Sequence, residues 1–328
     1  MALSLGAQGT QYLEPNEWLV SASYRYLNSF RDFHGSEEVP DPAPPELYAN
    51  THVHSFDFTV TYGLTRRFSL TLEVPSQYGT RESYYEHDGV SRHTMSAGGL
   101  GDLRLVGNLW LLAPDKHPDE NISLGLGLKA PTGDYGATDY SYRATGPVLR
   151  PVDPAIQPGD GGWGMLFVLQ AFKNFSKNSV AYLQGSYLSN PREMNGTETT
   201  NGDLPAFTGG DIGYTINSVP DQYMGRVGLA YSIWPKQGLS LSLGARIDGV
   251  PVRDLMGGSQ GFRVPGYVIY IEPGLSISKG KNFFSLTVPV AVERHASKSL
   301  ADRRTGNPLG GYAAFADFLI TASYSRLF

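Results

Sequence analysis

Apolar and polar residues alternate along most of this 328-residue chain, with a period of two positions. The period of 3.6 positions that marks an amphipathic helix is not sustained anywhere. In residues 238–248, one phase holds three leucines, Ala245 and Ile247, and the other holds serines, glycine, Arg246 and Asp248. Successive side chains of a strand point to opposite faces, so this pattern predicts strands with one apolar and one polar face.

Twelve segments carry the alternation, and most of them have ten or more residues. They are residues 16–27, 53–64, 67–78, 100–112, 121–130, 163–173, 179–188, 222–233, 238–248, 266–277, 282–293 and 312–328. A tilted strand of about 9–11 residues crosses a bilayer, whereas strands of soluble sheets usually have about 5–6. We therefore expect an all-β fold, a single antiparallel up-and-down transmembrane β-barrel of about 12 strands, rather than a soluble β-sandwich.

The connections alternate in length. Short ones follow the even strands, at 65–66, 113–120, 174–178, 234–237 and 278–281, and long ones follow the odd strands, at about 28–52, 79–99, 131–162, 189–221, 249–265 and 294–311. Outer-membrane barrels have short periplasmic turns and long extracellular loops. The sequence thus predicts one domain over residues 1–328 in the bacterial outer membrane, with residues 1–15 as a periplasmic N-terminal segment.

Composition narrows the possibilities further. The mean hydropathy is −0.24, and no run approaches the ~20 apolar residues of a membrane helix. Cysteine is absent, which excludes disulfides and thiolate chemistry, and a net charge of −5 gives no basic footprint for nucleic acid. Met1–Ala7 lacks the pattern of an export signal, so we expect such a signal to have been removed.

Charged residues inside the predicted strands fall on the polar phase, with Arg326 near the end of the chain as the exception. A lipid-facing Arg or Lys at the bilayer midplane would cost ~2–4 kcal/mol, so this phase should face the barrel interior. We expect ten of these residues to line a pore and contact solute: Arg25, Asp57, Glu73, Asp102, Arg104, Lys129, Arg226, Arg246, Glu272 and Asp317. Asp248 and Glu293 share the phase. Because buried charges need partners, ion pairing that stiffens the wall is the alternative role.

Aromatic residues near the strand ends predict the interfacial girdle of a membrane barrel. They include Tyr24, Tyr26, Tyr62, Trp163, Trp234 and Phe328. The last strand ends in the chain-terminal Phe328, which is typical of bacterial barrels whose assembly machinery reads the C-terminal strand. The partners predicted are therefore this machinery, outer-membrane lipids and a small-molecule solute.

Three segments resemble a family of outer-membrane transporters named after the meta pathway of phenol degradation. They are Gly99-Leu100-Gly101-Asp102-Leu103, Leu126-Gly127-Leu128-Lys129-Ala130-Pro131-Thr132-Gly133-Asp134 and Gln157-Pro158-Gly159-Asp160-Gly161-Gly162-Trp163-Gly164. The resemblance covers residues 95–170 well and the rest only in strand pattern. It implies a barrel that takes up small organic molecules, and it leaves the substrate open.

The function expected is an outer-membrane channel or passive transporter for small organic solutes, without a cofactor or a metal. His52 and His54 share a strand face but lack an evident third ligand, and the aspartates of 131–162 fit no calcium loop. One alternative is a lipid hydrolase that uses His295 and Ser297, with Asp302 or Asn307 orienting the imidazole. A second alternative is a barrel that holds partner proteins or lipids.

Overall fold

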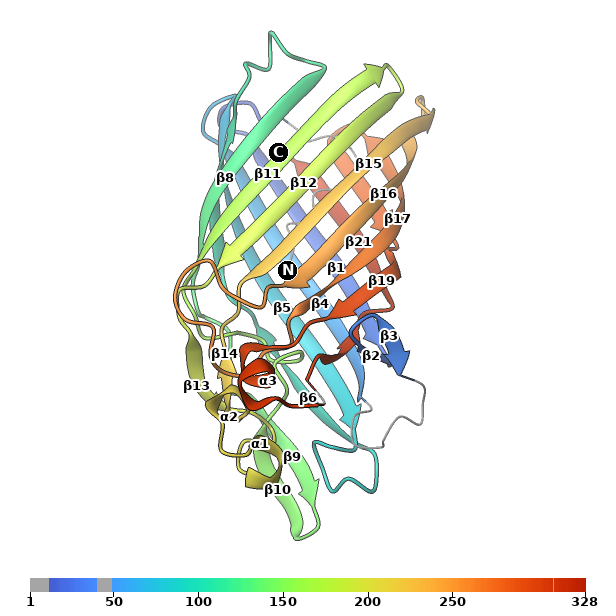
Figure 1. Ribbon diagram of the computed structural model, residues 1–328. Helices are drawn as coiled ribbons and strands as arrows, with labels where there is room; N and C mark the ends of the chain where they lie inside the picture. The colour runs from blue at the N-terminus through green and yellow to red at the C-terminus, as the bar shows by residue number, and fades with distance from the viewer. Residues whose placement is uncertain (1–11, 40–48, 309) are drawn as a thin grey trace.

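The computed structural model describes residues 12–39, 49–308 and 310–328, and over these residues the chain is a closed antiparallel β-barrel of 12 strands (Figure 1). The wall comprises β1 (Trp18–Ser29), β4 (Ala49–Gly63), β5 (Phe68–Ser83), β6 (His93–Leu100), β7 (Arg104–Trp110), β8 (Glu120–Lys129), β11 (Gly164–Ser176), β12 (Ser179–Ser189), β15 (Gln222–Trp234), β16 (Leu239–Val250), β17 (Gly266–Lys279), β18 (Asn282–Thr287), β19 (Val290–Ala296) and β21 (Phe318–Leu327). β6 with β7, and β18 with β19, are the halves of two interrupted strands. Pairing of β1 with β21 closes the barrel.

All twelve predicted strands are present, but several of their boundaries were wrong, those of the fourth and the last strand by the most. The fourth strand begins at His93 rather than at residue 100, because 93–100 pairs with an extended β5, so the predicted loop 79–99 shrinks to 84–92. The last wall strand begins at Phe318. The preceding segment, β20 (Tyr312–Phe315), pairs instead with β2 (Arg31–His34) in a small separate sheet.

The wall has an apolar outer face and a polar inner face. Phe56 and Leu126 are 53% and 62% exposed, whereas Arg104 on the opposite phase is 7% exposed. Trp18, Trp163, Trp234 and Phe328 also project outward near strand ends. A soluble barrel would bury the apolar phase, so this exterior is suited to hydrocarbon, with aromatic side chains toward its edges. Among the described residues, no helix is long and apolar enough to cross a membrane.

The short connections lie at one end of the barrel, here called the turn end, and the long ones at the other, the loop end (Figure 1). Residues 1–11 of the predicted N-terminal segment lie outside the described residues. Tyr12 packs against the inward-facing rings of Trp110 and Phe172, at centroid distances of 5.0 and 6.1 Å. The described part of this segment therefore enters the barrel at its turn end.

The long connections carry structure of their own. They contain β3 (Glu37–Val39), the hairpin β9 (Thr138–Arg143) and β10 (Gly146–Pro151), β13 (Met194–Glu198), β14 (Ile216–Ser218), and the short helices α1 (Pro205–Thr208), α2 (Ile212–Thr215) and α3 (Leu300–Thr305). Different connections also bind one another: Arg143 donates to Asn201 at 2.9 Å, and Asn201 donates to the Tyr85 carbonyl at 2.7 Å. The loop end is thus a connected cap (Figure 1).

His87 joins two of these connections and should make the cap sensitive to acid. Its Nδ1 accepts a 3.0 Å hydrogen bond from the Tyr142 amide, so the imidazole must be unprotonated there. Burial, and then the charges of His93 and Arg143, lower the pKa of His87 to about 4. An unfolded His titrates near pH ~6.5, so the unfolded loop binds more protons below that pH.

We therefore expect the cap to lose stability as the pH falls from about 6.5 to about 4, by at most about tenfold in local opening for each pH unit. Hydrogen-exchange protection factors of residues 84–92 and of Tyr142 measure this loss. A His87→Gln variant keeps an acceptor for the Tyr142 amide without a titrating group, so its protection should be flat over this range. Protection in the parent chain that is equally flat would contradict the assignment.

Candidate solute-binding site

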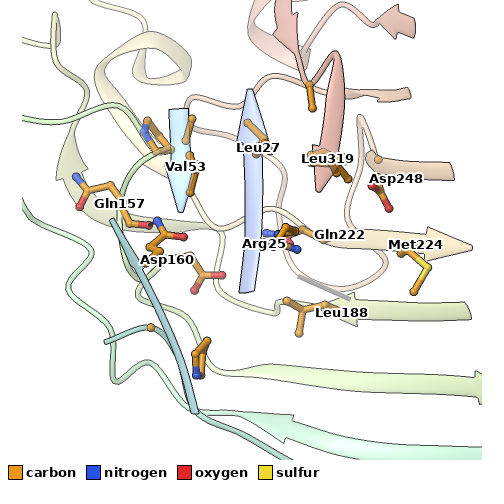
Figure 2. A pocket seen from close by; sticks show the side chains of 18 of the residues that line it. Arg25, Leu27, Val53, Gln157, Asp160, Leu188, Gln222, Met224, Asp248 and Leu319 are labelled. Carbon is orange, nitrogen blue, oxygen red and sulfur yellow. Dashed lines mark hydrogen bonds between the residues drawn. The ribbon is translucent and has the colours of Figure 1, made fainter. Parts of the chain in front are cut away.

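A cavity of about 530 Å³ lies inside the barrel, on the side of the loop end. Small-molecule sites usually have about 300–1,000 Å³, so this space is large enough for a small organic solute. Figure 2 shows side chains that converge on it from several strands and from one connection, including Arg25 and Leu27 of β1, Val53 of β4 and Gln157 of the connection.

One side of the cavity is formed by residues 152–160, which fold into the barrel. Val152 and Ile156 are fully buried against Val53, Met95 and Ala97 of the inner wall. Gly79 of β5 makes room for this segment, because a Cβ there would lie 2.6 Å from Ile156 Cγ2. The sequence placed 131–162 in a loop but gave no sign that part of it turns inward.

Lys129 of β8 holds the base of this inward segment. Its ammonium group lies 3.5 Å from Asp102 and makes a very short contact with Asp160. Asp102 also accepts hydrogen bonds from the amides of Gly133 and Asp160, at 3.0 and 3.2 Å.

Glycines let the same segments approach one another. A Cβ at Gly159 would lie 2.5 Å from the Gly133 carbonyl oxygen, so only glycine allows the two backbones to touch. The three family-like segments of the sequence therefore converge on a single buried junction that fixes the inward segment to the wall.

Next to Arg25, on the side of the loop end, the cavity has an apolar layer, and the polar Thr51 and Arg81 line it beyond this layer. Leu27 of β1 pairs across the strands with Val53 of β4 and with Leu319 of β21. Further apolar side chains complete the lining: Leu166, Leu188, Met224, Val264, Val268, Phe315, Pro154 and Pro158. A solute in this part would exchange water for hydrocarbon surface, which favours binding of an apolar group.

Toward mid-barrel the lining becomes charged. Arg104 pairs with Glu73 at 3.2 Å, and Arg246 lies 3.0 Å from Asp248. Glu272 joins Arg246 at 3.8 Å and makes a very short contact with Arg226. Glu73, Glu272 and Arg226 are buried, so these ion pairs stiffen the wall from within.

The ten predicted pore residues divide into two groups. Those that line the cavity are Arg25, Asp102, Arg104, Lys129 and Arg246. Asp57, Glu73, Arg226 and Glu272 are buried in the interior but outside the cavity lining. Asp317 lies toward the loop end, where Arg31 and Arg294 donate to its Oδ1 at 2.5 and 2.7 Å.

The prediction that Glu293 faces the interior was wrong. Ile269 of β17 pairs with Glu293 of β19, but the next residue, Tyr270, pairs with Ala291, which leaves Val292 as an extra residue in a β-bulge. The bulge shifts the alternation by one position. Glu293 is therefore exposed and accepts a 3.0 Å hydrogen bond from Tyr267, while Arg294 points inward to Asp317.

The residues of the alternative hydrolase site make hydrogen bonds to other partners. His295 Nδ1 lies 2.9 Å from the Oγ of Ser36, a residue of another connection. Asp302 caps α3 through the Ser299 amide and accepts from Tyr214, and Asn307 also donates to Tyr214.

The histidine pair on β4 has hydrogen-bonding partners of its own. His52 and His54 bond to the hydroxyls of Tyr26 and Tyr24, both at 2.8 Å. Within the described part of the chain, no three His, Cys, Asp or Glu side chains are grouped to hold a metal ion.

The closed wall and the apolar exterior define this chain as an outer-membrane β-barrel with a solute-sized interior cavity. It is similar over 100% of both chains to an outer-membrane channel from Pseudomonas putida F1, with a TM-score of 0.63 and 14% identity, which shows a shared fold. The β-domain of the Bordetella autotransporter BrkA gives a TM-score of 0.47 at 11% identity, over 95% of this chain and 100% of that one.

The toluene transporter TbuX of Ralstonia pickettii gives a TM-score of 0.45 at 8% identity, over 96% of this chain and 90% of that one. No protein-family model matches the chain, and a search of curated proteins finds no relative.

Proposed function

We propose that this barrel passes small organic solutes across the outer membrane by passive diffusion through its interior cavity. The observation that carries the proposal is the cavity of about 530 Å³ inside the wall, whose lining combines an apolar layer with charged side chains. Such a lining offers a partly apolar solute both a desolvated surface and polar groups on its way inward.

Five side chains are proposed to contact the passing solute: Arg25, Asp102, Arg104, Lys129 and Arg246. The buried Asp57, Glu73, Arg226, Glu272 and Asp317 would hold the interior wall rather than touch solute. This role agrees with the resemblance of residues 95–170 to transporters named after the meta pathway of phenol degradation. We also propose that β21, which ends at Phe328, is the strand that the barrel-assembly machinery recognises.

Filling the cavity should slow transport. We expect the double substitution Leu188→Trp and Met224→Trp, two residues of the lining, to reduce uptake at least about tenfold, the effect of an added barrier of about 1.4 kcal/mol. The measurement is uptake by liposomes that contain the full chain, with phenyl glucoside as a neutral probe and benzenesulfonate as an anionic one. Planar-bilayer conductance gives a second readout.

The matched control is Leu229→Trp, which makes the same change on the lipid-facing side of β15. It should leave uptake and conductance unaltered. Liposomes that admit neither probe, and bilayers without conductance, would overturn the proposed function. Equal uptake by the cavity-filled variant and the control would show that transport avoids this cavity.

A further inference from the structure

Arg25 occupies the boundary between the apolar and charged parts of the cavity. It points inward from β1 between Ser55 of β4 and Thr321 of β21, and its Nη2 donates to Ser55 Oγ at 3.2 Å. Figure 2 shows its side chain projecting from β1 among the residues that line the cavity. A solute that enters from the loop end therefore meets this guanidinium after the apolar layer.

Arg25 differs from the other positively charged side chains of the cavity lining in the distance to its nearest carboxylates. Those cations each have a carboxylate within 4.0 Å: Arg104 has Glu73, Arg246 has Asp248, Lys129 has Asp102 and Asp160, and Arg81 has Glu86. Among the described residues, no carboxylate lies within that distance of Arg25. The charges that act on it from farther away include three anions, Asp57, Glu73 and Asp248, and two cations, Arg104 and Arg246. The attraction of the anions is thus partly cancelled.

The apolar layer lies directly next to this cation. Leu27 follows Arg25 by two residues on the same face of β1, and its cross-strand partners Val53 and Leu319 flank it. An incoming solute would therefore place its apolar body against these three side chains and its leading group at Arg25. A guanidinium in a partly desolvated site binds a carboxylate by charge-assisted, often bidentate, hydrogen bonds.

We propose that the cavity prefers small apolar monocarboxylates, with the carboxylate bound by Arg25 and the hydrocarbon part held by Leu27, Val53 and Leu319. This inference rests on the proposed transport function and names the class of solute. A neutral hydrocarbon leaves Arg25 without a counter-ion. A sugar or a small polar acid would place hydroxyls or water against the apolar layer. Desolvation of these polar groups costs free energy, whereas a benzene ring has no such groups to desolvate.

Calorimetric titration of the full chain in detergent micelles tests this preference with three probes: benzoate, its neutral analogue benzamide, and acetate, which carries the charge without the ring. We expect benzoate to bind about 10- to 100-fold more tightly than benzamide, the range of a hydrogen bond to a charged group, and acetate to bind more weakly than benzoate. Arg25→Gln should bring benzoate to the level of benzamide and leave benzamide unchanged. Arg25→Lys should keep part of the difference.

Two further variants separate charge from structure. Asp57→Asn removes an anion that competes for Arg25, so it should tighten benzoate binding and leave benzamide alone. Arg66→Gln removes an arginine from an exposed turn, where it pairs with Glu14 and Asp115, and should change neither affinity. Heat-modified migration in gel electrophoresis confirms that each variant is folded.

The outcomes distinguish the two proposals. Equal affinity for benzoate and benzamide in the parent chain, or a preference that survives Arg25→Gln, would overturn the choice of carboxylates while binding of both rings still supports a solute cavity. Binding of acetate as tight as that of benzoate would overturn the apolar part of the proposal. If no probe binds and liposomes also exclude phenyl glucoside, the proposed function itself fails.

Discussion

Replacing Lys129 by methionine is expected to destabilise the folded barrel by about 3–5 kcal/mol, the usual result of removing one partner from a buried ion pair. Lys129 is 1% exposed, and its ammonium group is the shared counter-ion of Asp102 and Asp160. Methionine has a similar length but no charge, so the buried Asp102 and the partly exposed Asp160 would lose their counter-ion. The free energy of unfolding in guanidinium, measured in lipid vesicles, gives the size of the loss.

The control for this substitution is Lys173→Met at the turn end. Lys173 makes a 2.9 Å ion pair with Glu120, but the two side chains are 60% and 47% exposed, so the loss should be below about 1 kcal/mol. Adding Asp102→Asn and Asp160→Asn to Lys129→Met removes the unpaired anions and should restore part of the stability. Equal losses for Lys129→Met and Lys173→Met would show that the junction does not hold the inward segment.

The sequence was a good guide to the wall because a bilayer constrains every lipid-facing position. Each strand that crosses hydrocarbon must alternate strictly, so the outward phase is readable, as in Ile122, Leu124, Leu126 and Leu128 of β8. Past the membrane this constraint ends while backbone pairing continues. The extensions of β5 to Ser83 and of the fourth strand back to His93 therefore left no clear apolar signal.

The site was only partly predictable from the sequence. The polar phase of a strand shows which side chains point into the barrel, but it does not show how far they reach or which residues they pair with. Arg104 and Glu73 share the inward phase, yet only Arg104 reaches the cavity, since Glu73 is covered by its neighbours. The contact of Ile156 with Gly79 joins positions far apart in the chain, and no local pattern announces it. The bulge at Val292 left no clear signal in the alternation either, because the apolar phase continues through Val290 and Val292.

Replacing Leu124 by arginine on the outer face should destabilise the barrel in vesicles by about 2–4 kcal/mol, the cost of an arginine near the bilayer midplane. Leu124 lies near the middle of β8 and projects outward. The guanidinium would have to stay in hydrocarbon or distort the bilayer to reach water. Unfolding by guanidinium in the same vesicles as above measures this loss.

The matched control is Leu111→Arg, which makes the same outward substitution next to the turn that follows β7. The cost of a charge falls to about 0–1 kcal/mol near the interface, so Leu111→Arg should be nearly neutral. A soluble barrel would treat both sites alike, because water would hydrate either guanidinium. Equal stability of the two variants would therefore contradict the assignment of this outer face to a membrane. A loss of stability at Leu124 but not at Leu111 would show that the apolar phase of the strands faces hydrocarbon. The opposite phase, which carries Arg25, then faces the barrel interior.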